Sequence, residues 1–194
     1  MKILLAITGA SGSIYGLRLL EELLRGGHNV TLVASESGLE VCKYETGVSL
    51  GDAKVLCQRW NLSDLNLTLR DANDLWAPEA SGSAAPDAMV IAPCSMGTLG
   101  RIAAGISGNL IERAADVMLK ESCPLLLVPR ETPFSAIHLE NLLKLSRCGA
   151  RIIPAMPAFY HKPESVEQLV DFVVGKLLDQ LGVEHSLFKR WGET

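Results

Sequence analysis

The sequence has no long apolar run, no paired cysteine motif and no clear targeting segment. None of its apolar runs approaches the roughly 20 residues that a helix needs to cross a bilayer. The five cysteines are widely spaced and odd in number, and with the four histidines they form no plausible zinc set. A glycine turn follows the first apolar run where a signal peptide would have its cleavage site. We therefore expect a cytoplasmic protein in a reducing compartment, with no membrane contact and no metal.

The sequence also lacks a strong excess of charge of either sign. Eighteen basic and 22 acidic residues give a net charge of −4, and no basic stripe marks a nucleic-acid surface. With 194 residues and no repeat or linker, the chain predicts one domain over 1–194. Hydrophobic residues make up 48%, near the upper end for soluble proteins, and we attribute the excess to an interface between subunits.

Apolar, β-branched runs alternate with helical patterns along the chain. Strands are expected at 2–8, 29–34, 65–69, 88–92, 124–128 and 150–153. Helices are expected at 14–25, 36–46, 51–60, 95–104, 108–121, 135–147 and 164–181, followed by a tail over 182–194. This alternation predicts an α/β protein with a three-layer, doubly wound parallel sheet. In such sheets ligands bind beyond the carboxyl ends of the strands, which directs attention to the turns found there.

The first of these turns lies in TGASGSIYG, residues 8–16. Gly9, Gly12 and Gly16 allow a tight turn and close approach to a ligand, and the next helix offers N–H groups to a phosphate. A plain strand-to-helix turn is the alternative. The spacing GxxGxxxG is not the dinucleotide pattern GxGxxG, and the Tyr-x-x-x-Lys pair of short-chain dehydrogenases is absent. Glu36 lies about where a ribose-binding acid of NAD enzymes would sit, although Ser35 and Glu36 also fit the cap and first turn of the next helix. The turn therefore favours a nucleotide other than NAD.

Two later strand ends carry polar side chains. In APCSMGTLG, residues 92–100, Ser95 and Thr98 suit a phosphate or flavin edge, or else simply cap a helix. Cys94 has no clear histidine partner, which argues against a nucleophile. In VPRETP, residues 128–133, Arg130 and Glu131 are fixed between two prolines. This favours a functional pair over a salt-bridged connector.

Cationic residues on two helices are candidate phosphate ligands. Arg113 and Lys120 are seven residues apart and project from one side of a helix. Alternatively, Asp116 pairs with Lys120 on a solvated face. Lys176, at the border of an apolar stripe, either reaches an anion beside Tyr160 or only extends its stem along the surface.

Three further residues have two interpretations each. Glu45 is either a solvated acid at a helix end or a group at the ligand edge of the second strand. Trp76 and Trp191 lie in irregular segments, where they either fill the core or stabilise a cation with the ring face.

Eight separated motifs together closely resemble the flavin prenyltransferase (UbiX) family. They are TGASG, SGS at 81–83, PCSMGTL, IERAADVMLKE, PLLLVPRETP, IHLENLLKLS, PAFYH and RWGE, and the resemblance runs from residue 2 to 193. It implies a flavodoxin-like, Rossmann-type fold and a metal-free prenyltransferase. The family takes reduced FMN and dimethylallyl monophosphate, and joins the prenyl unit to flavin N5 and C6. Its product, prenylated FMN, goes to a UbiD-type decarboxylase, and its members form dodecamers with sites between subunits.

The resemblance also assigns residues. It implies FMN contacts from Gly9, Ala10, Ser11, Ser35, Ser95, Met96, Gly97, Thr98 and Arg130. It implies contacts to dimethylallyl phosphate from Ser81, Arg113, Lys120, Tyr160 and Lys176. The catalytic residues implied are Ser11, Glu45, Lys120, Glu131, Trp76 and Trp191, with Ser11 and Glu131 moving protons and a tryptophan sheltering the carbocation. The tail over 182–194 is expected to pack on a neighbouring subunit. The alternatives are an FMN-dependent aromatic acid decarboxylase and a non-catalytic FMN-binding module.

Overall fold

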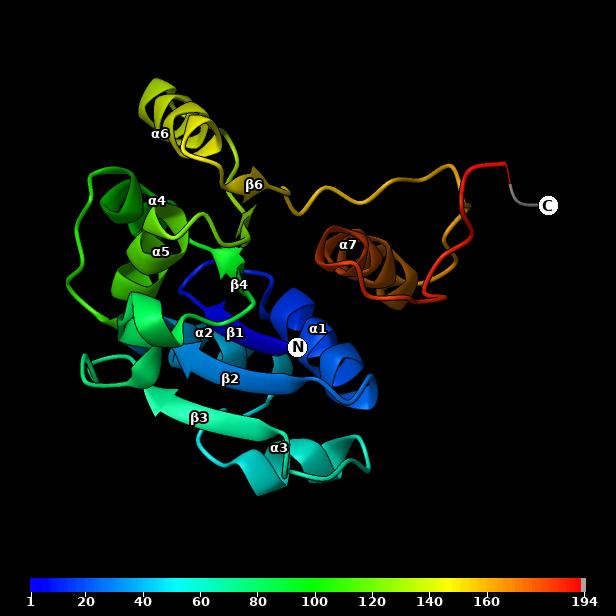
Figure 1. Cartoon of the computed structure of the whole chain (residues 1–194). Coiled ribbons are helices and arrows are strands. Elements are labelled where there is room, and N and C mark those ends of the chain that lie inside the picture. Colours follow the sequence, from blue (N-terminus) through cyan, green and yellow to red (C-terminus); the bar gives the residue numbers. More distant parts are fainter. Residues whose placement is uncertain (193–194) are drawn as a thin grey trace.

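The computed structural model describes residues 1–192, in which a six-stranded sheet lies between two layers of helices (Figure 1). Every pair of neighbouring strands is parallel, and the order is β3-β2-β1-β4-β5-β6, as in Rossmann-type sheets. The strands are β1 (Lys2–Ile7), β2 (Asn29–Ala34), β3 (Leu67–Asp71), β4 (Ala88–Cys94), β5 (Leu125–Pro129) and β6 (Arg151–Ile152). The predicted three-layer, doubly wound parallel sheet is confirmed.

Helices cover both faces of the sheet because side chains alternate along each strand. Ile3, Leu5 and Ile7 pack against one helical layer, whereas Leu4 and Ala6 pack against the other. The first layer holds α1 (Ser13–Arg25), α2 (Glu36–Thr46), α3 (Ala53–Arg59) and α7 (Val166–Leu181). The second holds α4 (Met96–Ala103), α5 (Leu110–Lys120) and α6 (Ala136–Arg147). The chain changes layer between β1 and β4, and the crevice at their carboxyl ends is where such sheets bind ligands.

A segment without a periodic sequence pattern forms two short turns of 3₁₀-helix, η1 (Pro78–Ala80) and η2 (Gly82–Ala84). Glu79 of η1 is buried, and one of its carboxylate oxygens accepts a hydrogen bond of 3.0 Å from the Thr31 hydroxyl of β2. Its other oxygen lies 3.5 Å from Arg70 Nε of β3. This polar contact fixes η1 over the β2–β3 edge, next to α5.

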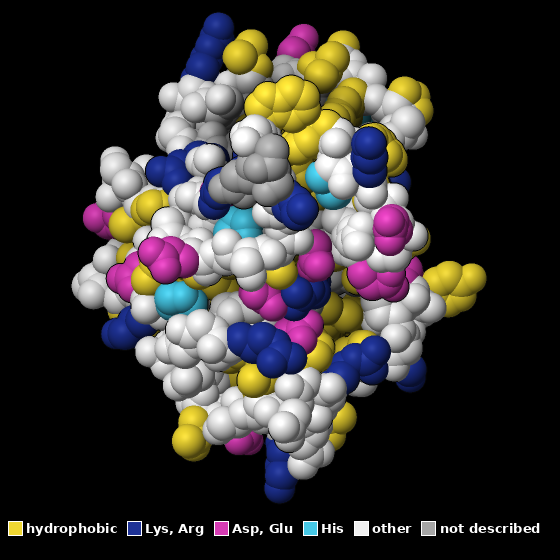
Figure 2. Space-filling model, turned by 90° about the vertical axis from the view of Figure 1, so that its right-hand side faces the viewer, with side chains coloured by type: hydrophobic (Ala, Val, Ile, Leu, Met, Phe, Trp, Pro, Cys, Tyr) yellow, Lys and Arg dark blue, Asp and Glu magenta, His cyan; other side chains and the backbone are white. Residues whose placement is uncertain are grey.

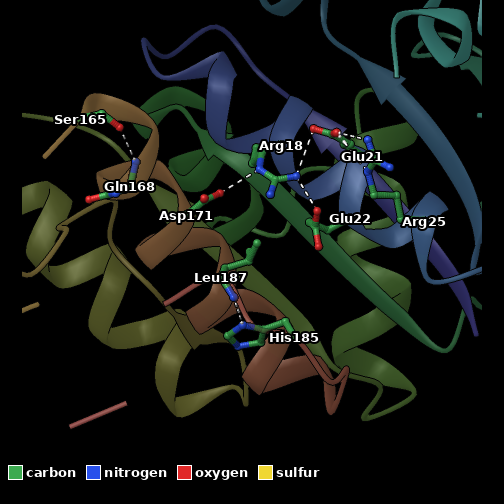
Figure 3. A network of polar contacts seen from close by, with 9 residues as sticks. All are labelled: Arg18, Glu21, Glu22, Arg25, Ser165, Gln168, Asp171, His185 and Leu187. Carbon is green, nitrogen blue, oxygen red and sulfur yellow. Dashed lines mark hydrogen bonds and ion pairs between the residues drawn. The ribbon is translucent and has the colours of Figure 1, made fainter. Parts of the chain in front are cut away.

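An ion-pair network fastens α7 to α1 (Figure 3). Arg18 of α1 donates through Nε to Asp171 of α7 at 2.8 Å, and its Nη1 also pairs with Glu21 and Glu22. The Arg18 and Asp171 side chains are about one quarter exposed, so water screens the pair less than it would at an open surface. The network joins elements that are 153 residues apart in the sequence.

The described part of the tail folds back onto α7 of its own chain. A Cβ on Gly175 would lie 2.5 Å from the Phe188 ring, so this close approach requires a glycine. Asp179 accepts from Arg190 at 2.7 Å and lies 3.2 Å from His185 Nε2. The bond from Arg190 is the main reason that the pKa of Asp179 is lowered, and His185 adds to it against the effect of burial. Packing of the tail on a neighbouring subunit stays a prediction, and residues 193–194 lie outside the described part.

Between residues 1 and 192, no helix combines the length and apolar character that crossing a membrane requires. The same residues contain no group of three or more His, Cys, Asp or Glu side chains placed to hold a metal ion.

Candidate flavin site at the carboxyl edge of the sheet

Two glycines shape the turn between β1 and α1. Gly12 has a φ of 104°, a left-handed conformation that glycine adopts without strain. A Cβ on Gly16 would lie 2.2 Å from the backbone oxygen of Ala92, so α1 packs directly on the end of β4. The turn is therefore set by the close contact of α1 with the sheet.

Glu45 of α2 binds this turn through its carboxylate. One of its oxygens accepts from the N–H groups of Gly12 at 2.9 Å and Ser13 at 3.1 Å. Burial raises the pKa of Glu45, but hydrogen bonds from the Ser11 side chain and these N–H groups, with the charge of Arg130, hold it below its usual value. Glu45 is therefore not a merely solvated acid at a helix end.

This contact corrects the interpretation of the α1 N-terminus as a phosphate site. Two of the N–H groups at this helix end, those of Gly12 and Ser13, are already bound by the Glu45 carboxylate. A negative charge does lie at this helix end, as the helix dipole favours, but a side chain supplies it.

Arg130 connects the end of β5 to the same turn. Its Nε donates to the backbone oxygen of Ser11 at 3.2 Å. The next residue, Glu131, is half-buried, and its Oε1 accepts from the N–H of Thr132 at 3.0 Å. The structure thus brings Ser11, Glu45 and Arg130 into one cluster, with Glu131 beside it in the chain.

Thr8 joins the ends of β1 and β4, and sequence reasoning missed it. The buried Thr8 hydroxyl donates to the backbone oxygen of Pro93 at 2.9 Å and accepts from the N–H of Ser95 at 2.8 Å. The available signal was a lone hydroxyl at the end of an apolar strand, directly before the glycine turn. Thr8 places the start of α4 beside the β1–α1 turn.

Two other helix N-termini at this edge are better placed for a phosphate than α1. Ser95 caps α4 by accepting from the N–H of Thr98 at 3.2 Å, and Ser35 caps α2 in the same way. Within residues 1–192 no hydrogen-bond partner meets the N–H groups of Met96 and Gly97 in the first turn of α4. Capping and phosphate binding are therefore compatible at α4.

Gly9 and Ala10 pack the turn against α2 and the end of β1. A Cβ on Gly9 would lie 2.3 Å from Ser37 Oγ, so the turn lies directly against the first turn of α2. Ala10 is buried, and its N–H donates to the backbone oxygen of Thr8 at 2.8 Å.

Cys94, next to this edge, is fully buried, and that burial raises its pKa to about 12. A thiol in this state is no nucleophile, as expected from its lack of a histidine partner.

Three of the residues expected to bind dimethylallyl phosphate meet where η1 and η2 lie against α5. Arg113 Nε donates to the backbone oxygen of Ala80 at 3.0 Å, next to Ser81. Lys120 forms an ion pair with Glu121, and a Cβ on Gly82 would lie 2.8 Å from Lys120 Nζ. We call Ser81, Arg113 and Lys120 the α5 group.

The alternative ion pair predicted on α5, between Asp116 and Lys120, is wrong. Asp116 does not pair with Lys120. It pairs with Arg113, three residues away, at 2.7 Å. Both spacings put side chains on neighbouring positions of a helix, so sequence alone does not choose between them.

Tyr160, Lys176 and Trp191 form a second group on the other side of the molecule, which we call the α7 group. The Tyr160 ring lies edge-on to Trp191, with centroids 5.1 Å apart. Lys176 Nζ lies 5.8 Å from the centroid of Phe188 and 3.8 Å from Asp179. Figure 2 looks onto this side of the molecule and shows basic side chains with a hydrophobic area above them.

Neither Trp76 nor Trp191 fills the core. Trp76 is 98% exposed in the loop between β3 and η1, and Trp191 is 80% exposed in the tail. The core-filling interpretation is therefore wrong for both. Each presents a large aromatic surface outward, and only Trp191 lies with the α7 group.

A single chain does not unite the α5 and α7 groups. Helix α5 packs on the face of the sheet that also holds α4, whereas α7 packs on the opposite face beside α1 (Figure 1). The residues expected to bind the phosphate thus divide between two sides of the molecule.

Comparisons with known proteins show which family the chain is similar to in sequence and fold. The Flavoprotein family model matches residues 1–178. Flavin prenyltransferase UbiX of Halalkalibacterium halodurans is 53% identical over 188 residues, which cover 96% of this chain and 91% of that protein. A structure of AnUbiX (PadA1) in complex with FMN and dimethylallyl pyrophosphate superposes with a TM-score of 0.91, 41% identity and coverage of 100% and 98%.

A dodecameric FMN-dependent Ubix-like decarboxylase from Escherichia coli O157:H7 gives a TM-score of 0.89 at 43% identity, with both chains fully covered. Identity of this size over nearly the whole length does not arise from a shared fold alone. The chain belongs to the flavin prenyltransferase (UbiX) family.

Proposed function

We propose that this protein is a flavin prenyltransferase that transfers a dimethylallyl group from dimethylallyl monophosphate to reduced FMN. The C–O bond to phosphate breaks, and carbon bonds form at flavin N5 and C6 as the prenyl double bond is consumed. The two displaced flavin hydrogens leave as protons, one proton is added to the middle carbon of the prenyl unit, and inorganic phosphate is released. No electrons are gained or lost overall, so the reaction needs no further oxidant. The prenylated FMN then passes to a UbiD-type decarboxylase.

The observation that carries this proposal is the cluster of Ser11, Glu45 and Arg130 at the carboxyl edge of the sheet. It lies where α/β sheets bind ligands, beside the open N–H groups at the start of α4. FMN fits there with its phosphate on α4 or α2, because Glu45 holds the start of α1. Glu131, next to Arg130, is then the group that takes up a proton at the flavin.

The cations of the chain supply stabilisation of the leaving group. Negative charge grows on phosphate as its bond to the allylic carbon breaks, and Arg113, Lys120 and Lys176 match that charge. Because Lys176 and Tyr160 lie on the opposite face from Arg113 and Lys120, we propose that two copies of the chain complete one site. The dodecameric state described for the Escherichia coli relative supports this assembly.

Prenyl transfer is tested directly by mass spectrometry. The chain is incubated without oxygen with reduced FMN and dimethylallyl monophosphate, and in a parallel arm with the diphosphate. The expected result is a flavin heavier by one five-carbon unit less one hydrogen, formed faster from the monophosphate. An unchanged flavin mass in both arms would overturn the proposal, and a preference for the diphosphate would correct the donor.

The shared site is tested by mixing two inactive variants, Lys120→Ala and Lys176→Ala. If each site draws these lysines from different copies, mixed oligomers regain sites with both lysines and recover part of the activity. The matched control mixes Lys120→Ala with Arg113→Ala, which belong to the same group and restore nothing together. Equal recovery in both mixtures would contradict the proposed arrangement.

The second candidate function is an FMN-dependent aromatic acid decarboxylase, because the Escherichia coli relative is described as a decarboxylase. This activity predicts release of carbon dioxide from an aromatic acid by the chain alone, without a prenyl donor. A non-catalytic FMN-binding module predicts neither product. We place the protein in the cytoplasm, since all five cysteines are free thiols.

A further inference from the structure

The loop over residues 130–135 carries Arg130 and Glu131 from β5 to the start of α6. Its first residue is fixed by the bond from Arg130 to the Ser11 backbone. Its middle is exposed at Thr132 and Pro133, and Phe134 packs only partly buried against the α4–α5 side of the core. The position of the loop therefore depends on how its far end is held.

The far end is held by a capping box that uses a histidine. Ser135 Oγ accepts from the N–H of His138 at 3.2 Å, and His138 Nδ1 accepts from the N–H of Ser135 at 3.2 Å. Glutamate or glutamine normally occupies the position of His138. Because a backbone N–H can only donate, Nδ1 must be unprotonated, and the neutral ring carries its proton on Nε2.

The same ring also contacts the loop. The Phe134 and His138 rings meet edge to face at 86°, with centroids 6.3 Å apart. Within α6, Leu145 is fully buried and Leu142 packs partly buried against the same core, while Ile137 and Leu143 are more than half exposed. The first turn of α6 has no fully buried side chain, so the capping box and the Phe134–His138 contact are what join it to the loop.

We infer that His138 is a positioning residue, whose neutral imidazole holds the 130–135 loop so that Arg130 and Glu131 face the flavin. Protonation removes the acceptor at Nδ1 and puts a positive charge at the N-terminus of a helix, where the dipole opposes it. The effect of the loop position on catalysis rests on the proposed function, whereas the contact between His138 and the loop does not.

The charged groups around His138 are few. The loop contributes Arg130 and Glu131, and α6 itself carries Glu140, Lys144 and Arg147. Arg101 is the charged residue of α4, which packs against α6, and it is paired with Glu112. Arg151 of β6 donates to the backbone oxygen of Gln180.

The hold on the loop is tested by hydrogen exchange measured by mass spectrometry on peptides that cover residues 130–138. The full chain is compared with His138→Ala and His138→Gln at pH 7.5, after correction for intrinsic exchange rates. Glutamine restores an acceptor that does not titrate. Loss of one capping bond corresponds to about a fivefold change in an opening equilibrium. We expect that loss of protection in His138→Ala and its recovery in His138→Gln.

Activity gives a second, separate readout. For prenylation, kcat should fall in His138→Ala and recover in His138→Gln, with KM for dimethylallyl phosphate nearly unchanged. In the control His28→Gln, which removes an imidazole that lies 3.4 Å from the N-terminal amine, kcat should be unchanged.

Equal protection of the loop in wild type and His138→Ala, or protection in His138→Gln as low as in His138→Ala, would overturn the inference. If no form of the protein prenylates flavin, the proposed function fails, and the exchange data still decide whether His138 holds the loop.

Discussion

Replacing Glu45 by glutamine tests how the β1–α1 turn is held. The carboxylate accepts two backbone N–H bonds and lies at the N-terminus of α1. Hydrogen bonds to a charged acceptor contribute about 1.5–3 kcal/mol and neutral ones about 0.5–1.5 kcal/mol. Glu45 is exposed, and its amide replacement keeps one oxygen, so values at the low end apply. We expect Glu45→Gln to lower the free energy of unfolding at pH 7 by about 1–2 kcal/mol.

The stability difference between wild type and Glu45→Gln should depend on pH in a defined direction. The pKa of Glu45 is lower in the folded protein than in the unfolded chain, despite the opposing effect of burial. Its stabilising effect is therefore complete above the unfolded pKa, near 4.3, and is lost as the pH falls through the folded pKa. Wild type and Glu45→Gln should differ by a constant amount from neutral pH down to about pH 5 and converge below about pH 4.

The assay is urea unfolding at fixed protomer concentration, because assembly of subunits shifts apparent stability. Thermal unfolding gives a parallel value, since 1 kcal/mol moves Tm by about 2–4 °C for a chain of this length. Glu40→Gln is the matched control, an exposed acid on the same helix that makes no hydrogen bond among the described residues, and it should leave both values unchanged. A Glu45→Gln variant as stable as the wild type at pH 7, or a difference that persists at acid pH, would refute the reasoning.

Three further changes have expected outcomes. Gly16→Ala places a methyl group 2.2 Å from the Ala92 oxygen and should cost about 1–3 kcal/mol in urea unfolding. Asp171→Asn breaks the pair with Arg18 and should cost about 1 kcal/mol in the same assay, since the pair is partly buried. Glu131→Gln should leave FMN affinity unchanged in a fluorescence titration and slow prenylation about 100-fold or more. Unchanged turnover would remove the proton-transfer role proposed for Glu131.

The sequence predicts the fold closely because its local signals agree with the tertiary packing. The apolar run of β4 is buried on both faces, as a central parallel strand requires. The expected helices and the observed ones differ by at most two residues at either end. The exceptions are η1 and η2, since a helix of three residues is too short to show a period. Burial of Glu79 there depends on Thr31 and Arg70, which are distant in sequence.

The candidate site is predicted less completely, because its key contacts join distant segments. Gly12 and Glu45 are 33 residues apart, and no local pattern indicates that the carboxylate binds the turn. The turn glycines suggest an anion at the start of α1. A negative charge does lie there, but it belongs to the Glu45 side chain and not to a ligand. The role of Thr8 is equally hard to predict from the sequence, because its hydroxyl finds its hydrogen-bond partners only when β4 lies beside β1.

The division of the phosphate ligands between two faces follows from the topology. Helix α5 leads into β5 on the far side of the switch point, whereas α7 returns to cover β1 beside α1. Lys120 and Lys176 therefore cannot converge within one chain while the sheet stays intact. The ion pairs from Arg18 hold α7 on its face, so movement of α7 across the sheet would break them. A site that uses both lysines must take them from different copies, which makes assembly a condition of activity in the proposed function.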